Sequence, residues 1–366
     1  MNDDDHMYST TSLKKNILRL SEKYFDIILS IRRHLHQYPE LSFQEYQTAQ
    51  YIESILKKWN VPYKQVTRTG LIAYIGNVRS KKCIAIRADI DALPIQEKNT
   101  QVYASKHAGI MHACGHDVHT ACALGSIRVL KNLEPYINGC IKIFFQPGEE
   151  VLPGGAQLFI QENALRKPKV QSMIAQHVFP DLEVGQLGFR AGPYMASTDE
   201  IYITIKGKGG HGAMPQQAKN PIPVAAALIH QITNEYPIER MMQEQIVISF
   251  GKINGAGTTN VIPEITEIAG TMRTLNPQKR KTLYQYLKQT IQKISKQYKT
   301  DIDLNIVRGY PPLVNDEILT KFFRQKAAEL VGSKNIIELP VRMTADDFAY
   351  YLQYLPGTYY RLGTGN

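Results

Sequence analysis

The chain has 366 residues, of which 43% are hydrophobic, and a formal net charge of +10. This hydrophobic content excludes an intrinsically disordered chain, and the length corresponds to roughly two domains. The positive charge does not indicate nucleic-acid binding, because much of it lies on expected helix faces and no nucleic-acid-binding motif accompanies it.

The first half of the chain alternates strands with helices. We predict a helix at 46–59, a strand at 83–88, a helix at 119–130, and strands at 140–145 and 172–177. The strands are apolar runs rich in β-branched residues, which is typical of buried parallel strands. This alternation predicts an α/β catalytic domain with a mixed, largely parallel sheet flanked by helices. Functional groups are expected at the carboxyl ends of its strands.

The pattern changes after residue 192. We predict a strand at 201–205, a helix at 220–232, strands at 245–250 and 264–274, a helix at 277–298 and a strand at 302–307. This is the element order of a ferredoxin-like α+β domain. We therefore predict a domain inserted at 193–310. The catalytic domain would comprise 1–192 and 311–366, and would resume with a helix at 315–331.

Neither a secretory signal nor a membrane-spanning segment is expected. The start of the chain, Met1–His6, is acidic and polar, and the apolar stretch Tyr24–Ile31 is too short to span a bilayer. The four cysteines are Cys83, Cys114, Cys122 and Cys140. So few cysteines in a large chain without a secretory signal indicate reduced thiols. We therefore expect a cytoplasmic protein that does not bind membranes.

The densest group of potential metal ligands lies at 112–119. It contains His112, His116 and His119 together with Cys114. Cys114 and His116 are two residues apart, so on an extended segment they would point to the same side. Thiolate and imidazole are good ligands for zinc-like ions. A lone histidine is more often a core residue, but this clustering favours a metal site. A redox role of Cys114 is disfavoured because no C-x-x-C motif is present.

Two adjacent carboxylates, Glu149 and Glu150, directly follow the predicted strand at 140–145. In a hydrolase one carboxylate can bind a metal, while the other takes a proton from metal-bound water and passes it to the leaving nitrogen. A pair of glutamates alone usually lies on the surface. The position of this pair at a strand end, beside the ligand cluster in an α/β order, favours the functional interpretation.

Two further histidines stand out. His177 ends an apolar strand, and His211 lies in the glycine-rich segment 207–215. Glycines allow the backbone to turn tightly around a presented histidine. A phosphate-binding loop is disfavoured because neither glycine-rich phosphate motif is matched.

Together these segments resemble the M20 metallopeptidase family, in particular its amidohydrolase branch. That branch includes aminoacylases, hippurate hydrolases, auxin-conjugate hydrolases and N-acetyl-diaminopimelate deacetylases. The resemblance extends over nearly the whole chain. It is carried by 33–43, 87–94, 112–119, 147–150, His177, 209–211, 259–263, 346–349 and 362–366.

The resemblance implies a hydrolase that cleaves the amide bond of N-acyl amino acids or similar small amides with metal-activated water. It implies two divalent ions per chain, which could be Mn, Zn, Co or Ni. Cys114 would bridge the ions. His116 and His177 would hold one ion, and Glu150 the other.

The resemblance also implies the remaining roles. Glu149 would be the general base and acid, while Asp91 and His112 would orient the ligands. The inserted domain would be both a lid and the surface of a homodimer. Across that dimer, His211 and Asn260 would stabilise the charge that develops on the carbonyl oxygen.

This chain departs from the branch in one respect. The branch supplies a final histidine ligand shortly after the motif matched by 362–366, and no histidine follows His230 here. Either the chain is truncated at its C-terminus or the protein has lost one ligand, and in both cases we expect a weak second metal site. The alternative function is a catalytically weakened relative that still binds metal or small amides. Two ions per chain would favour the enzyme, and one or none the weakened relative.

Overall fold

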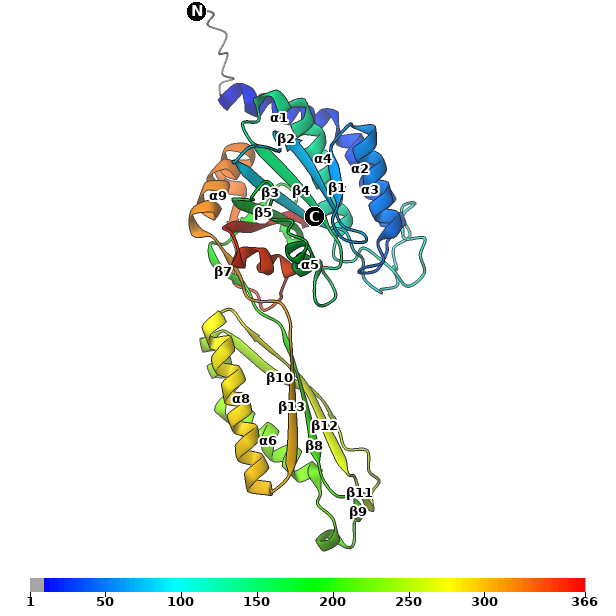
Figure 1. Ribbon diagram of the computed structural model, residues 1–366, viewed down its shortest axis with the longest axis vertical. Helices are drawn as coiled ribbons and strands as arrows, with labels where there is room; N and C mark the ends of the chain where they lie inside the picture. The colour runs from blue at the N-terminus through cyan, green and yellow to red at the C-terminus, as the bar shows by residue number, and fades with distance from the viewer. Residues whose placement is uncertain (1–9, 366) are drawn as a thin grey trace, which may run out of the picture. The chain divides into compact units, whose positions relative to one another are not determined.

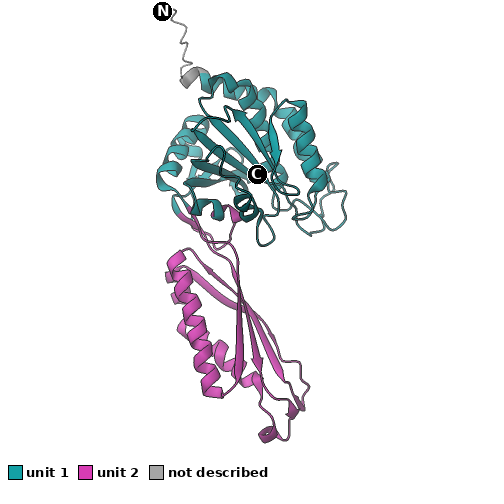
Figure 2. Ribbon diagram, in the orientation of Figure 1, with its two compact units in different colours: residues 1–192, 315–340, 350–366 teal, residues 193–314, 341–349 magenta. Residues whose placement is uncertain are grey.

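The computed structural model describes residues 10–365, which divide into two compact units (Figure 2). Unit 1 comprises the chain up to residue 192 together with 315–340 and the part from 350 onward, and unit 2 comprises 193–314 and 341–349. The sequence-based boundaries assigned 341–349 to the catalytic domain. In the structure this segment belongs to unit 2, because the Ala196 amide donates to the carbonyl oxygens of Arg342 and Thr344.

Unit 1 is built around an eight-stranded mixed sheet (Figure 1). Its strands are β1 (Tyr63–Gln65), β2 (Leu71–Gly76), β3 (Cys83–Asp89), β4 (Cys140–Gln146), β5 (Ser172–Glu183), β6 (Leu187–Phe189), β15 (Ile336–Glu338) and β16 (Gly357–Gly365). Their order is β1-β2-β4-β3-β5-β16-β6-β15. The neighbours β4, β3, β5 and β16 run parallel, while β2 pairs antiparallel with β4 and β6 antiparallel with β16. The predicted α/β fold with a mixed sheet flanked by helices is confirmed.

Helices cover this sheet. They are α1 (Thr10–Lys23), α2 (Phe25–Gln37), α3 (Tyr46–Lys58), α4 (His116–Asn132), α5 (Gly155–Gln161) and α9 (Glu317–Val331), with the short 3₁₀ helices η1 (Glu134–Tyr136), η3 (Ser333–Asn335) and η4 (Asp347–Gln353). One core joins α2, α3 and α4 to alternate residues of the central strands. Its fully buried members include Leu56, Leu124, Ile127, Ile143 and Phe145. This packing fixes the start of α4 beside the carboxyl ends of β3 and β4.

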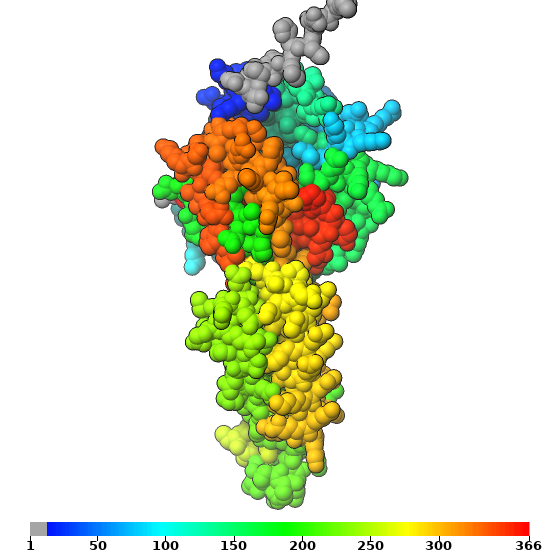
Figure 3. All heavy atoms as spheres, turned by 90° about the vertical axis from the view of Figure 1, so that its left-hand side faces the viewer, coloured from blue at the N-terminus to red at the C-terminus, as the bar shows by residue number. Residues whose placement is uncertain are grey.

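Unit 2 contains an antiparallel four-stranded sheet in the order β10-β12-β8-β13. Its elements are β7 (Gly192–Met195), β8 (Asp199–Lys206), β9 (Gly210–His211), η2 (Pro215–Gln217), α6 (Pro221–Glu235), α7 (Ile238–Glu244), β10 (Ile246–Asn254), β11 (Val261–Ile262), β12 (Ile265–Thr274), α8 (Pro277–Tyr298), β13 (Asp301–Arg308) and β14 (Leu313–Asn315). The sheet strands with α6 and α8 follow a βαββαβ order. The two helices lie side by side on one face of the sheet (Figure 3).

Within residues 10–365, no helix combines the length and the apolar character that crossing a bilayer requires.

The start of α4 differs from the sequence-based expectation. The helix was predicted from residue 119, with Cys114 and His116 on an extended segment, but α4 begins at His116 and a turn precedes it. The predicted start was too late, and the first turn of α4, which the prediction left out, is mostly polar. Gly115 makes the turn possible, since it has a φ of +84° in the left-handed region. A Cβ atom at Gly115 would lie only 2.4 Å from Val178 Cγ2.

The substitution Gly115→Ala should therefore lower the free energy of unfolding. We expect a loss of about 2–4 kcal/mol, which combines the left-handed backbone penalty with the steric conflict at Val178. Gly185→Ala is the matched control, because Gly185 has a φ of +92° but no atom within 4 Å of the added Cβ. It should cost only about 1 kcal/mol. Urea unfolding measures both, and equal losses would show that the contact with Val178 contributes nothing.

Candidate metal centre

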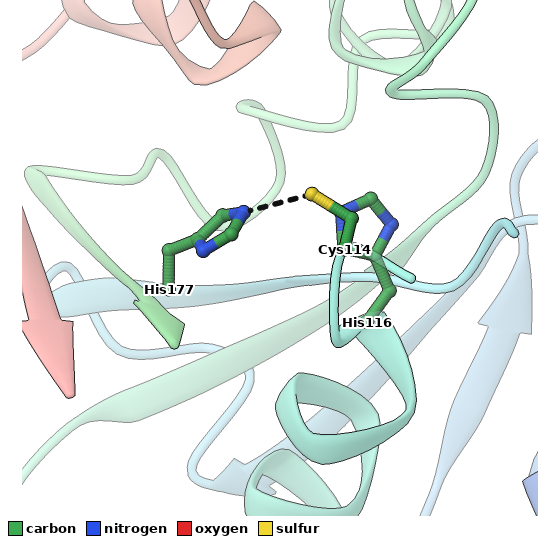
Figure 4. A group of neighbouring side chains, drawn as sticks. All are labelled: Cys114, His116 and His177. Carbon is green, nitrogen blue, oxygen red and sulfur yellow. Dashed lines mark hydrogen bonds between the residues drawn. The ribbon is translucent and has the colours of Figure 1, made fainter. Parts of the chain in front are cut away.

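Cys114 lies at the centre of the predicted ligands. Its Sγ atom is 3.2 Å from His177 Nε2 (Figure 4), and the thiol also contacts the side chains of His116 and Glu150. The ligand atoms of Cys114, His116 and His177 all lie within 4.8 Å of one another. The same holds for His116, Glu149 and Glu150. The structure thus brings together every residue that the sequence singled out as a ligand or base.

Hydrogen bonds on the far side of each ring orient the two histidines. His116 Nδ1 lies 2.9 Å from the main-chain oxygen of Asp91 and 3.1 Å from its Oδ1 atom. His177 Nδ1 lies 2.7 Å from the main-chain oxygen of Val178. Because an acceptor at Nδ1 places the proton there, the Nε2 atom of each ring keeps its lone pair for a metal. His116 Nε2 is buried and has no hydrogen-bond partner among residues 10–365.

His119 is close to the same point but is used differently. Its Nδ1 atom donates to the Asp89 carboxylate, and its Nε2 atom accepts a 3.0 Å hydrogen bond from the Val178 amide. Burial lowers the pKa of His119, which agrees with a neutral ring that donates on one side and accepts on the other. Both ring nitrogens are occupied, so His119 holds β5 against β3 and is not available as a ligand.

The loop that carries the two glutamates is held by buried carboxylates. Glu45 accepts 2.8 Å hydrogen bonds from the amides of Gly148 and Phe43 and from the Thr69 hydroxyl. The amide of Glu150, two residues after Gly148, donates to Asp91 Oδ2 at 3.0 Å. Burial and the charge of Asp91 raise the pKa of Glu45 to about 7. These contacts fix the backbone on both sides of Glu149.

The charge of the site suits a cation. Asp89 and Asp91 are fully buried beside His116, and Glu150 Oε1 is buried without a hydrogen-bond partner in the described part of the chain. Burial opposes the charged form of His116, but Asp89, Cys114 and the hydrogen bond to Asp91 together outweigh it and raise the pKa of His116 well above its usual value. A divalent ion would displace this proton, as metals do when they bind imidazole. One sulfur, two imidazole nitrogens and a carboxylate oxygen form a donor set that fits a zinc-like ion.

His112 precedes Cys114 by two residues. It is buried, and burial lowers its pKa to about 4. Neither of its ring nitrogens has a hydrogen-bond partner among the described residues. The role of His112 in orienting a ligand therefore stays a prediction.

His211 and Asn260 lie together in unit 2. His211 is the residue opposite Val261 in the pairing of β9 with β11, and the Gly212 amide donates to the Asn260 carbonyl oxygen at 2.7 Å. Both side chains are exposed. Their proposed action on a substrate carbonyl stays a prediction.

The sequence did not identify several residues around the centre. Asp89 lies two positions before Asp91, so proximity to Asp91 could have found it, whereas His119 was counted among the potential ligands and its structural role was missed. Glu45 gave no signal because it precedes a predicted surface helix. Asp117 was also missed. It joins His36 and Arg32 in a buried network in which His36 Nδ1 lies 2.8 Å and Arg32 Nε 2.9 Å from its Oδ2 atom.

Comparisons with known proteins agree with this geometry. The family model described as peptidase family M20/M25/M40 matches residues 85–366. N-acetyl-L-cysteine deacetylase of Bacillus subtilis (strain 168) is 38% identical over 98% of this chain and 86% of its own length. N-acyl-L-amino acid amidohydrolase of Geobacillus stearothermophilus is 37% identical over 82% of this chain and 81% of its own. A solved dinuclear metal binding peptidase of the M20 family from Bacillus subtilis has a TM-score of 0.80 and 32% identity, covering 94% of this chain and 90% of that one.

Replacing Cys114 should remove a thiolate from the metal. With Co²⁺ as the probe, the wild-type chain should show a thiolate-to-cobalt charge-transfer absorption, and Cys114→Ser should lose this band and bind less metal. Cys122→Ser is the matched control, since Cys122 belongs to none of the ligand groups found in residues 10–365. An unchanged cobalt spectrum in Cys114→Ser would contradict the ligand assignment.

Proposed function

The chain belongs to peptidase family M20/M25/M40, as its motifs indicated, and we propose that this hydrolase of amide bonds acts on N-acyl amino acids and similar small amides. The observation that carries the proposal is the convergence of Cys114, His116, His177 and Glu150 on one point, with Glu149 within reach of it. The substrate class is supported by the two relatives named for N-acetyl-L-cysteine and N-acyl-L-amino acids.

Two divalent ions would be held by the converging ligands. Cys114 would bridge them, because its thiol contacts ligands on both sides, with His116 and His177 on one ion and Glu150 on the other. Mn, Zn, Co and Ni are all compatible with this proposal. When bound, such ions supply Lewis-acid polarisation of a carbonyl group and lower the pKa of water.

Glu149 is the proposed general base and acid. Its side chain is 7% exposed, and its carboxylate lies within 4.8 Å of the ligand atoms of His116 and Glu150. It would take the proton from the attacking water and deliver it to the leaving nitrogen. Asp91 would keep His116 in the tautomer whose Nε2 lone pair is free, and its bond to the Glu150 amide would keep the glutamates aligned.

Unit 2 is proposed to act as a lid and as the surface of a homodimer. Helices α6 and α8 cover one face of its sheet, while the other face exposes apolar side chains such as Tyr202 and Ile265. His211 and Asn260 are exposed on paired segments of this unit, so both side chains could reach a second copy of the chain. There they would donate to the oxygen on which negative charge develops.

The Glu149→Gln variant should keep its metal and lose hydrolysis. In a screen of N-acetyl, N-benzoyl and indole-acyl amino acids, with each metal added back, the wild-type chain should hydrolyse at least one class. The carboxamide cannot accept a proton, and base catalysis is typically worth about 10²–10⁴-fold. Glu162→Gln, at an exposed glutamate, is the control and should keep full turnover. Wild-type-like turnover of Glu149→Gln would place the base elsewhere.

Mixing two inactive variants tests the shared site. A His211→Ala chain combined with a Glu149→Gln chain should recover part of the wild-type rate, because a mixed dimer contains one site with both residues intact. Each variant alone should stay inactive. If subunits exchange freely and the mixture remains as inactive as its parents, His211 does not act on a partner subunit.

A further inference from the structure

Two thiols lie opposite each other at the end of the sheet that is remote from the metal ligands. Cys83 and Cys140 are the first residues of β3 and β4, and they are direct partners in the register of these parallel strands. Both are free cysteines and almost fully buried. The proposed hydrolysis uses neither of them.

The pairing already has the geometry that a disulfide needs. Neighbouring strands lie about 4.7–4.9 Å apart, and disulfide-linked Cα atoms are typically about 4.4–6.8 Å apart. Register partners point to the same face of a sheet, and a side-chain hydrogen bond joins these two thiols. The two side chains therefore lie opposite each other on neighbouring strands.

The two thiols are not equivalent. The hydrogen bond from Cys83 lowers the pKa of Cys140, and the nearby Lys142 ammonium acts in the same direction. The same hydrogen bond, together with burial, raises the pKa of Cys83. Lys142 is itself buried and is held by the carbonyl oxygens of Ala164 and Arg166 at 2.9 and 2.8 Å. Lys142 is two residues from Cys140 on the same strand and so on the same face, and a cation in that position favours a thiolate.

Because both thiols are buried, a small oxidant reaches the pair only when the strand ends open. A groove of about 770 Å³ lies beside the starts of these strands, and Tyr74 is one of its lining residues. Tyr74 is the strand neighbour of Lys142, and its hydroxyl is influenced by the charges of both Cys140 and Cys83. Lys82, the residue before β3, is exposed, whereas Gly139, the residue before β4, is buried. Strand ends also open more readily than strand centres.

We propose that Cys83 and Cys140 form a peroxide-reactive dithiol that closes to a disulfide between β3 and β4. The Cys140 thiolate attacks one oxygen of hydrogen peroxide, so that the O–O bond breaks and a sulfenic acid and water form. The Cys83 sulfur then attacks the sulfenic sulfur, its proton leaves with the hydroxyl group as water, and the S–S bond forms. One peroxide is reduced to two waters and two thiols are oxidised. The new bond closes the chain segment that contains Cys114 and His116.

The test is to oxidise the metal-loaded full-length chain with hydrogen peroxide and to map its thiols. After quenching and alkylation, the free thiols should fall from four to two, and non-reduced peptide mass spectrometry should find Cys83 joined to Cys140. Cys122→Ser is the matched control and should form the same link. Loss of thiols at Cys114 or Cys122 with Cys83 and Cys140 still alkylated would overturn the proposal, as would four intact thiols.

Single replacements test the order of the steps. In Cys83→Ser the reaction should stop at a sulfenic acid on Cys140, which dimedone traps and which forms no cross-link. In Cys140→Ser, Cys83 should stay reduced at the same peroxide dose. Faster oxidation of Cys83 in Cys140→Ser than of Cys140 in Cys83→Ser would overturn the assignment of Cys140 as the attacking thiolate.

Discussion

One buried carboxylate, Asp91, connects the segments that build the metal centre. It accepts hydrogen bonds from the Ser42 hydroxyl at 2.7 Å, the Glu150 amide at 3.0 Å and His116 Nδ1 at 3.1 Å. Burial raises the pKa of Asp91, but the hydrogen bond and charge of His116 and the hydrogen bonds from Glu150 and Ser42 together lower it below its usual value. Because a buried charge is stable only when it is paired, the fold around Asp91 requires all three segments to be in place. The position of each ligand therefore depends on this residue.

The sequence predicted the central fold because its strands are uniformly apolar. The runs beginning at Cys83 and Cys140 are largely buried, as parallel strands are, and both were located to within a residue. The order of the strands could not be predicted. β16 (Gly357–Gly365) lies between β5 and β6, although it follows them by more than a hundred residues. Apolar content marks a strand, but it does not specify a partner that is distant along the chain.

The sequence predicted which residues gather at the metal centre, but not which of its histidines keep a ring nitrogen free for a metal. His116, His119 and His177 are close together in the fold. They differ in the hydrogen bonds of their ring nitrogens. His116 bonds to Asp91, His119 to Asp89 and the Val178 amide, and His177 to the main-chain oxygen of Val178. These partners come from other strands and loops. The tautomer of a buried histidine is thus a property of the tertiary structure, and a local motif cannot reveal it.

The register of β3 with β4 fixes chemistry at both ends of the strands. It places Asp89 opposite Gln146, just before the glutamate loop, and it places Cys83 opposite Cys140 at the other end. A slip of one residue would turn the side chains of one strand to the other face. It would separate the thiols and move Asp89 away from His119 at the same time. Because the apolar core on one face sets this register, the packing that positions the metal ligands also holds the two cysteines opposite each other.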